Sequence, residues 1–599
     1  MKTKEILQNI FGLDEFRGHQ QAIIEHVIKG DDVFVLMPTG GGKSLCYQIP
    51  ALIRSGVGIV ISPLIALMQD QVNALLQLGV NAAFLNSSLD AHEMHKIEQK
   101  MIQEKLDLVY VAPERLLTPY FLNLLEKTNI ALFAIDEVHC ISQWGHDFRP
   151  EYRELSLLHE RFPTVPRIAL TATADQPTRE EIIERLNLSN AYHFTSSFDR
   201  PNIFYRIQQK QNPYEQLYAF IQKEHPTDAG IVYCLSRKGV EEAADWLCEK
   251  GLHALPYHAG MSNFLRQRNQ MRFISDESII IVATVAFGMG IDKSNVRFVA
   301  HLDLPKSIES YYQETGRAGR DGLPANAWLS YGLKDVITLR RMMDASEAIE
   351  QHKRLERRKL EALLGFCETT LCRRQVLLGY FNELYKGPCH HCDNCLTPPT
   401  VLDGKIIAQK ALSCVYRTGQ RFGVKYLTDI LLGKKTPQVE RFNHDKVSTF
   451  GIGQAYTQQQ WQSIYRQLVA ANLLSVDMSG YGGLRLTEKS LPLLRGEMNI
   501  SLRVDTDSPS KKNKTKLIEK LKVIPKDTLW DALKNKRLEL ARELKVPPYV
   551  IFHDTSLLEM HAKLPSTLSE FEKIIGVGQS KLKRFGEVFI AIIRQFSHN

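Results

Sequence analysis

Residues 33–44 read VFVLMPTGGGKS, and this stretch decides the fold of the first third of the chain. Its apolar half predicts a buried strand, and its glycine-rich half predicts a turn that opens a helix. Glycines let backbone N–H groups curl around phosphates, Lys43 can meet the β- and γ-phosphate charge, and Ser44 can ligate magnesium. Met37 replaces the first glycine of the strict pattern, so a plain glycine-rich turn is the alternative. The residues expected to bind a nucleotide here are Thr39, Gly40, Gly41, Gly42, Lys43 and Ser44.

A pair of carboxylates, Asp136 and Glu137, follows the apolar residues 131–135, which predict a second buried strand. Asp136 would hold the magnesium through its water shell, and Glu137 would orient and deprotonate the attacking water. A solvated acidic turn is the alternative. The phosphate loop about ninety residues upstream favours the catalytic interpretation.

Two arginines at a spacing of three, Arg317 and Arg320, occur in residues 313–320, which read QETGRAGR. One face of a helix or turn can carry both, and hydrolysis needs positive charge at the γ-phosphate. Because they lie in a second α/β segment, they would complete the site only when two domains close. A salt-bridged helix start is the alternative.

Parallel α/β architecture is predicted between residues 30 and 335, where runs of Val, Ile, Leu and Ala alternate with helix-length segments. Two tandem α/β domains follow, with residues 196–202, which contain Pro201, as the linker. The strands are expected at 33–37, 58–62, 108–112, 132–136 and 168–171, and then at 230–234, 279–283 and 296–301.

Four of the ten cysteines crowd together after a long charged helix. Their spacing is C-x16-C-x2-C-x2-C, and four thiolates can close a tetrahedral site around one structural zinc ion. Buried small side chains are the alternative, and His390 and His391 are competing ligands. The expected zinc ligands are Cys372, Cys389, Cys392 and Cys395.

Length and charge give only broad bounds. The 599 residues exceed one hydrophobic core, and the net charge of +8 fits a polyanion partner without proving one. No apolar run approaches the ~18 residues of a membrane span, and the start lacks the apolar core of a signal peptide. We therefore expect a folded multidomain protein that stays in the cytoplasm and has no membrane partner.

These residues resemble superfamily 2 helicases, and closely the RecQ family of DNA helicases. Residues 136–150, which read DEVHCISQWGHDFRP, are similar to the family's Walker B box and the aromatic-rich loop after it. Shorter matches lie at 62–64, 112–116, 170–174, 257–260 and 283–290. The resemblance implies a nucleoid-associated enzyme that uses ATP with Mg²⁺, has DNA-stimulated ATPase activity and moves 3′ to 5′ along single-stranded DNA. It also implies unwinding of duplex or branched DNA in repair and recombination.

The same resemblance implies a multidomain α/β fold. Two tandem RecA-like parallel-sheet domains are followed by a zinc-binding helical module, a winged-helix domain and a small all-α C-terminal domain. The boundaries are 1–205 and 206–342 for the RecA-like domains, 343–400 for the zinc module, 401–507 for the winged helix, 508–526 for a basic linker and 527–599 for the helicase-and-RNase-D C-terminal (HRDC) domain.

Further ligand contacts are implied by the resemblance. Arg17 and Gln20 match the adenine-recognition element, and in the winged helix the helix around 461–472 and the wing at 473–486 are expected to contact duplex DNA. Arg417 and Arg495 are candidates for binding the C-terminal tail of single-stranded-DNA-binding protein. In the HRDC domain, Tyr549, Lys581 and Lys583 are candidates for single-stranded DNA, although they fit core and solvated surface equally well.

The aromatic-rich loop is expected to couple DNA to hydrolysis, because it begins close to the predicted magnesium ligand. Its flat rings can stack on unpaired bases, and Arg149 offers charge for a phosphate. Packing of Trp144 into the core is the alternative. The predicted DNA-binding and coupling residues are His139, Trp144, His146, Phe148 and Arg149.

Three functions compete at this point: a DNA helicase, an RNA helicase or remodeller, and a non-catalytic DNA-binding scaffold. The complete set of catalytic residues disfavours a scaffold. The aromatic-rich loop, the zinc module and the C-terminal domain together disfavour RNA specificity.

Overall fold

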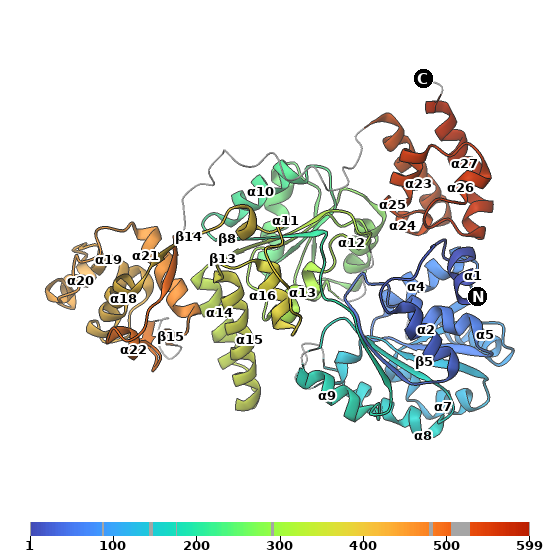
Figure 1. Cartoon of the computed structure of the whole chain (residues 1–599), viewed down its shortest axis with the longest axis horizontal. Coiled ribbons are helices and arrows are strands. Elements are labelled where there is room, and N and C mark those ends of the chain that lie inside the picture. Colours follow the sequence, from blue (N-terminus) through green and yellow to red (C-terminus); the bar gives the residue numbers. More distant parts are fainter. Residues whose placement is uncertain are drawn as a thin grey trace.

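The computed structural model describes residues 2–86, 89–142, 148–174, 176–288, 293–477, 483–504 and 527–597. Its domains form an elongated molecule, with the winged helix at one end and the C-terminal helices beside the first lobe at the other (Figure 1). Among the described residues, no helix combines the length and the apolar character that a membrane span requires.

The first lobe is a seven-stranded parallel sheet in the order β3-β4-β2-β5-β6-β1-β7. Its central strands are buried along their whole length, as their continuous apolar runs predict. The strands are β1 (Val33–Leu36), β2 (Val57–Ile61), β3 (Ala82–Leu85), β4 (Leu108–Val111), β5 (Ile130–Ile135), β6 (Arg167–Thr171) and β7 (Tyr192–Thr195). The helices are α1 (Lys2–Asn9), α2 (Gln20–Lys29), α3 (Leu45–Ile53), α4 (Ile65–Gln77), α5 (Ala91–Ile102), α6 (Pro113–Leu116), α7 (Pro119–Glu126), α8 (Leu157–Arg161) and α9 (Gln176–Arg185), with 3-10 turns η1 (Val138–Ile141) and η2 (Pro150–Ser156).

The second lobe is a six-stranded parallel sheet in the order β10-β11-β9-β12-β13-β8. Its edge strand β8 pairs with β13 from Ala325 opposite Ile203 to Tyr331 opposite Gln209. The strands are β8 (Ile203–Gln209), β9 (Gly230–Tyr233), β10 (Ala254–Tyr257), β11 (Ile280–Ala283), β12 (Phe298–His301) and β13 (Ala325–Tyr331). The helices are α10 (Pro213–Glu224), α11 (Arg237–Glu249), α12 (Asn263–Ser275), α13 (Ile308–Thr315) and α14 (Leu333–Asp344).

The zinc module continues the second lobe through α15 (Glu350–Glu368), α16 (Arg373–Tyr380) and α17 (Asp393–Leu396). The Asp393 carboxylate accepts from the backbone N–H of Ile207 in β8 at 2.9 Å and pairs with Arg373 Nε at 2.9 Å. Arg373 in turn donates to the Phe366 carbonyl at 2.7 Å. These polar contacts tie the module to the edge strand of the sheet.

The winged-helix domain is a helical core with two small antiparallel ribbons. It joins α15 through Glu368, which pairs with Arg466 and, at 3.0 Å, with Arg503. Its strands are β14 (Thr400–Asp403), β15 (Leu474–Asp477), β16 (Gly483–Leu486) and β17 (Ser501–Val504). Its helices are α18 (Lys405–Arg417), α19 (Val424–Leu431), α20 (Pro437–Arg441), α21 (Gln458–Ala470) and α22 (Ser490–Leu494), with the 3-10 turn η3 (His444–Lys446).

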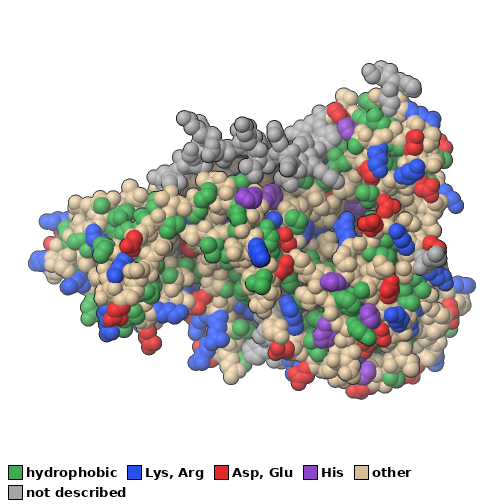
Figure 2. All heavy atoms as spheres, viewed as in Figure 1, with side chains coloured by type: hydrophobic (Ala, Val, Ile, Leu, Met, Phe, Trp, Pro, Cys, Tyr) green, Lys and Arg blue, Asp and Glu red, His purple; other side chains and the backbone are tan. Residues whose placement is uncertain are grey.

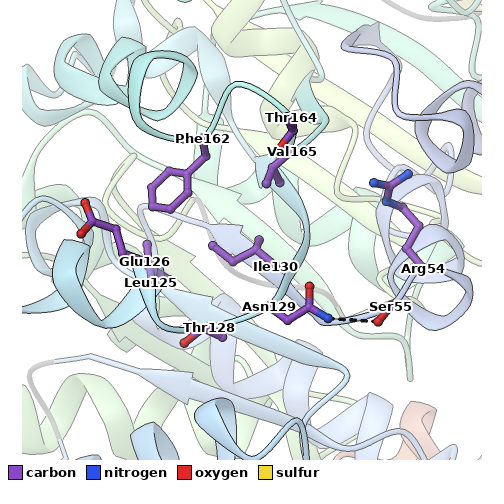
Figure 3. Close-up of a pocket in the computed structure, with 10 residues that line it drawn as sticks. All are labelled: Arg54, Ser55, Leu125, Glu126, Thr128, Asn129, Ile130, Phe162, Thr164 and Val165. Atoms are coloured by element: carbon purple, nitrogen blue, oxygen red, sulfur yellow. Dashed lines mark hydrogen bonds between the residues drawn. The ribbon is translucent and has the colours of Figure 1, made fainter.

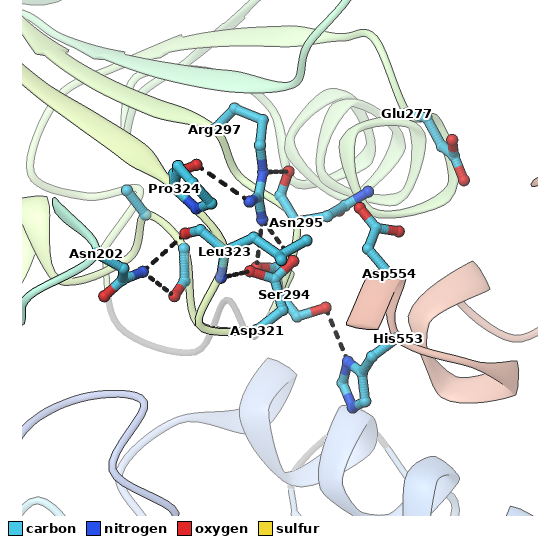
Figure 4. Close-up of polar contacts among 12 residues, drawn as sticks. Asn202, Glu277, Ser294, Asn295, Arg297, Asp321, Leu323, Pro324, His553 and Asp554 are labelled. Atoms are coloured by element: carbon cyan, nitrogen blue, oxygen red, sulfur yellow. Dashed lines mark hydrogen bonds and ion pairs between the residues drawn. The ribbon is translucent and has the colours of Figure 1, made fainter. Parts of the chain in front are cut away.

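The C-terminal domain is all α-helical and docks on both lobes. On the first lobe, the Gly576 N–H donates to the Gly12 carbonyl at 2.7 Å, and Ser580 Oγ donates to the Gln77 carbonyl at 3.1 Å. On the second lobe, His553 Nδ1 lies 3.0 Å from Ser294 Oγ, next to the carboxylate of Asp554 (Figure 4). The helices are α23 (Thr528–Leu544), α24 (Pro548–Ile551), α25 (Asp554–Lys563), α26 (Leu568–Phe571) and α27 (Gln579–Ser597).

Candidate nucleotide site, zinc centre and DNA contacts

The phosphate loop follows β1 and bends through two left-handed glycines, with φ of 79° at Gly40 and 80° at Gly42. A Cβ atom at Gly41 would lie 2.9 Å from the Pro38 carbonyl oxygen, so the middle position also requires glycine. Lys43 Nζ donates to the Met37 carbonyl at 3.1 Å, which holds the ammonium across the mouth of the loop. The turn therefore has the curled backbone of a phosphate cradle, even though Met37 replaces its first glycine.

Gln20, the first residue of α2, is hydrogen-bonded to this loop. Its amide nitrogen donates to the carbonyls of Gly41 and Gly42 at 3.2 and 3.1 Å, and its amide oxygen accepts from the Arg17 N–H at 2.9 Å. An adenine contact by the Gln20 amide, as the resemblance implies, would require these bonds to rearrange. The Arg17 side chain is exposed and stays free to approach a ring.

The carboxylates Asp136 and Glu137 lie just after β5, as the apolar run predicts. Asp136 Oδ1 accepts from the Glu137 N–H at 2.9 Å, and the Tyr152 hydroxyl donates to the Asp136 carbonyl at 2.9 Å. Glu137 adopts a left-handed φ of 48°. That conformation, which is uncommon for glutamate, turns the chain sharply at this strand end.

A line of polar contacts leads from Glu137 to the second lobe. His139 is buried, and its Nδ1 lies 3.3 Å from Glu137 Oε2 and 2.9 Å from Thr171 Oγ1. Thr171 Oγ1 donates to the Thr173 carbonyl at 3.1 Å, and Gln313 Nε2 donates to Thr173 Oγ1 at 2.5 Å. Gln313 is part of α13 in the second lobe. Glu137 is thus connected to the opposite lobe by a series of polar contacts, one of which uses the Thr173 backbone carbonyl.

The two predicted arginine fingers lie in different surroundings. Arg317 is buried inside the second lobe near Tyr233, whose pKa is raised to about 12 by burial although the Arg317 charge opposes the rise. The Arg320 Cα, in contrast, is 3.6 Å from the position that a Cβ would take at Gly40. Of the pair, Arg320 is therefore the one whose backbone lies against the phosphate loop.

The aromatic-rich loop is described only at its two ends. Trp144 and His146 fall within 143–147, outside the described residues. Phe148 lies beneath the Arg153 guanidinium, 5.0 Å from the ring centroid, and Arg149 Nη1 is 3.6 Å from Glu114 Oε1.

The four predicted zinc ligands come together. The sulfur atoms of Cys372, Cys389, Cys392 and Cys395 all lie within 4.8 Å of one another. Cys389 Sγ and Cys395 Sγ are 3.8 Å apart. A tetrahedron with Zn–S bonds of about 2.3 Å has edges of about 3.8 Å, so the residues fit one Zn²⁺ with four thiolates. The cysteines alone complete the cluster, and His390 and His391 are not needed as ligands.

One prediction about the winged helix needs correction, and one stays a prediction. The helix expected as a recognition helix, α21, is buried over most of its length, and Gln467 Nε2 donates to the Arg503 carbonyl at 2.9 Å. It packs against α15 and β17 instead of presenting a face to duplex DNA. Arg417 and Arg495 lie at opposite ends of α18, because Lys405 at its start bonds the Gly496 carbonyl. With a rise of 1.5 Å per residue they are about 18 Å apart, too far to share one carboxylate.

Tyr549, the aromatic candidate for single-stranded DNA in the HRDC domain, is not exposed. Tyr549 lies in α24, which packs on α4 of the first lobe, and only 8% of it is exposed. Lys581 is also buried, over the ring of Phe552, whereas Lys583 is exposed. Two of the three candidate side chains are thus covered, Tyr549 on a helix that packs on α4 and Lys581 within the core of its own domain.

A hollow of about 520 Å³ in the first lobe contains no predicted site residue. It lies where β2, β5 and β6 begin, at the edge of the sheet opposite the phosphate loop (Figure 3). Asn129 Nδ2 donates to Ser55 Oγ at 3.0 Å there, and the Arg54 guanidinium is bonded to backbone carbonyls. These contacts give the polar side chains of the lining a structural role, because their polar atoms are bonded to other parts of the protein.

Sequence reasoning missed two residues that bridge the lobes. Gln313 was quoted only as part of a motif, and Arg200 only as part of a linker. The sequence signal that could have identified Arg200 is its place between the apolar residues Phe198 and Pro201, because apolar neighbours suggest that the segment is buried.

Known proteins match this chain over nearly its whole length. The family models that match are DEAD/DEAH box helicase at residues 17–182, helicase conserved C-terminal domain at 212–322, RecQ zinc-binding at 333–396, RQC domain at 398–511 and HRDC domain at 526–593. The ATP-dependent DNA helicase RecQ of Haemophilus influenzae is 44% identical over 594 residues, which cover 98% of this chain and 95% of that protein. Proteins of the same description from Pasteurella multocida and Bacillus subtilis are 44% and 35% identical and cover 99% and 100% of this chain, and 93% and 99% of their own.

Proposed function

The chain belongs to the RecQ family of ATP-dependent DNA helicases, and on that premise we propose that it moves 3′ to 5′ on single-stranded DNA and unwinds duplex or branched DNA in repair and recombination at the nucleoid. The observation that carries this proposal is the approach of residues 316–320 of the second lobe to the phosphate loop of the first, where Gly316 and Thr39 nearly touch. An ATPase site divided between two lobes makes hydrolysis depend on their closure. We also propose the domain boundaries stated above.

Each residue proposed for hydrolysis has a role that follows from its charge. Lys43 would meet the charge of the β- and γ-phosphates of ATP. Ser44 and Asp136 would hold Mg²⁺, which would supply further neutralisation of phosphate charge. Glu137 orients the attacking water and accepts its proton. Arg320 approaches the γ-phosphate from the second lobe, and Arg317 stabilises the loop that carries it.

Coupling to DNA would use the contacts that end at Glu137. A strand bound at the aromatic-rich loop, through Trp144, His146, Phe148 and Arg149, displaces the segment that begins beside His139. His139 contacts both Glu137 and Thr171, so a small shift of its ring changes the position of the hydrolytic carboxylate. A cavity of about 220 Å³ next to His139 is lined by two lysines, Lys306 and Lys359, and by two glutamates, Glu309 and Glu356. Lys359 pairs with Glu309 at 3.1 Å, so the lining carries both signs of charge.

Duplex DNA would meet the winged helix at its outer tip. Lys and Arg side chains gather there at the far end of the molecule (Figure 2). The exposed basic residues in the described part of this domain include Arg417, Arg421, Lys425, Lys434, Lys435, Arg441 and Lys446, and further along the chain Arg485, Lys489 and Arg495. This surface, together with the wing β15–β16, takes the place of the buried helix α21. An acidic protein tail, such as that of single-stranded-DNA-binding protein, would have to run along α18 to reach both Arg417 and Arg495.

Four preparations test the proposal: wild type, Lys43→Ala, Glu137→Gln and Arg320→Ala. Lys43→Ala and Arg320→Ala should lose hydrolysis, and Glu137→Gln should bind ATP without turnover. Wild-type ATPase should respond to single-stranded DNA and not to RNA, and a duplex with a 3′ tail should be unwound in preference to one with a 5′ tail. Equal stimulation by RNA, or preference for the 5′ tail, would contradict the proposal.

A further inference from the structure

Arg200, in the linker between the lobes, binds backbone carbonyls of both nucleotide-site loops. Its Nη1 donates to the Thr39 carbonyl of the phosphate loop at 2.7 Å and to the Gly316 carbonyl at 3.0 Å. Its Nη2 donates to the carbonyls of Ala318 and Gly319 at 2.9 and 3.0 Å. One planar guanidinium thus holds four acceptors, of which one belongs to the first lobe and three to the second.

These bonds are costly to replace, because Arg200 is almost completely buried. Burial lowers the pKa of Arg200 from its ordinary value, yet a guanidinium keeps its proton in a protein. The carbonyl dipoles must therefore compensate for the lost hydration of the charge. Lysine has one point of charge and cannot reproduce the planar fork that reaches all four oxygens.

The linker that carries Arg200 is held from the other side by the zinc module. Arg374 Nη2 donates to the carbonyls of Arg200 and Ile203 at 3.1 and 2.9 Å, and its Nε pairs with Asp199 at 3.1 Å. The rings of Phe198 and Phe381 stack at 4.5 Å with an interplanar angle of 8°. The backbone at Arg200 is therefore fixed relative to α16, and the guanidinium is aimed by a rigid support.

We propose that Arg200 is a positioning residue for ATP hydrolysis, which clasps the loop of Arg320 to the phosphate loop when the lobes close. This inference rests on the proposed function. Three of its bonds set the shape of residues 316–319, and the bond to Thr39 sets the distance between that loop and the phosphate loop. When the lobes separate, the Thr39 bond breaks while the other three remain, so that Arg200 travels with the second lobe and re-forms the site on closure.

The first test separates turnover from binding. Arg200→Gln should lower kcat of DNA-stimulated hydrolysis by at least about tenfold while KM for ATP changes by less than about threefold, because the lost contacts matter when the finger engages. Arg200→Lys should give an intermediate kcat. Arg206→Gln is the matched control, since Arg206 lies six residues away on β8 and pairs with Glu224 at 2.8 Å. An unchanged kcat in Arg200→Gln, or a kcat lowered equally in Arg206→Gln, would overturn the proposal.

The second test is a double-mutant cycle with Arg320→Ala, measured in single-turnover hydrolysis so that slow rates stay visible. If Arg200 acts through the loop of Arg320, adding Arg200→Gln to Arg320→Ala should lower the rate by less than about threefold. A further tenfold loss would mean independent action and would overturn the clasp. If Arg320→Ala alone hydrolyses ATP at the wild-type rate, the role of Arg320 in the proposed function is wrong. The positioning role of Arg200 is then judged by the kcat of Arg200→Gln. Melting temperature and binding of a non-hydrolysable ATP analogue are measured on every variant, and a fall in rate that follows a loss of folded protein counts against positioning.

Discussion

Replacing Glu277 should release the HRDC domain from the second lobe. Glu277 follows α12 and receives two cations of α23, with Arg537 Nη2 at 2.5 Å and Lys534 Nζ at 2.6 Å. Although burial opposes it, these cations hold the pKa of Glu277 below its ordinary range. Removing one partner of a buried pair costs about 3–5 kcal/mol. We expect the lower end for Glu277→Ala, because Arg537 keeps Asp554 at 2.7 Å and Lys534 is partly exposed.

A loss of about 3 kcal/mol corresponds to about two orders of magnitude in the docking equilibrium. Hydrogen exchange reads this equilibrium directly, since the Gly576 N–H bonds to Gly12 only when the domain is docked. Its exchange should accelerate by about 100-fold in Glu277→Ala, while the Leu557 N–H, which bonds His553 within the domain, should keep its rate. Lys536→Ala is the control, because Lys536 pairs locally with Glu539 at 2.6 Å. Unchanged exchange at Gly576 in Glu277→Ala would refute the assignment of Glu277 as a docking anchor.

Three further predictions follow from the zinc module, the inter-lobe contacts and the HRDC core. Cys395→Ser should leave less than one zinc per chain by elemental analysis and a lower melting temperature, because metal binding in such modules is largely folding free energy. Gln313→Ala should uncouple the lobes, lowering DNA-stimulated ATPase by about tenfold with unchanged nucleotide affinity, measured by analogue binding. Burial lowers the pKa of Lys581 from 10.5 to about 8, so the unfolded chain holds the proton more tightly than the folded domain. The protonated side chain therefore lowers the free energy of unfolding. This destabilisation is complete below pH 8 and fades between pH 8 and 10.5. Lys581→Met should therefore raise the unfolding free energy of the HRDC domain by about 2–3 kcal/mol at pH 7 in urea denaturation and by little at pH 10.5, with Lys583→Met unchanged at both.

Most interior strands were predictable, whereas the edge strands and the interior strand β13, whose sequence contains Asn326 and Ser330, were not predicted. β1, β2 and β5 are covered on both faces, so their sequences are continuous apolar runs. β7 is mostly exposed and β10 contains Pro256 with only one fully buried residue, so neither carries the pattern of a central strand. Their positions depend on pairing with a neighbouring strand, which is a long-range contact.

The same distinction applies to the candidate site. The phosphate loop, Asp136-Glu137 and the four cysteines are local patterns whose chemistry follows from residue type and spacing. The engagement of Gln20 with Gly41 and Gly42 spans about twenty residues, and the bond from Arg200 to Thr39 spans 161. Burial of Tyr549 depends on docking against another domain. Contacts of this kind are set by tertiary structure and leave no periodic trace in the sequence.

Two contacts between the lobes leave the same stretch of chain, and on the proposed function they would couple closure to hydrolysis. Gln313 reaches Thr173 at 2.5 Å, and a few residues later the carbonyl of Gly316 shares Arg200 with Thr39. Hydrogen bonds weaken steeply once the donor–acceptor distance exceeds about 3.2 Å, so a rigid displacement of the second lobe by about 1 Å weakens both contacts together. One contact leads through His139 to the hydrolytic carboxylate, and the other fixes the phosphate loop. With the roles proposed for Glu137 and Arg320, a single movement would therefore disturb both the activation of water and the approach of Arg320.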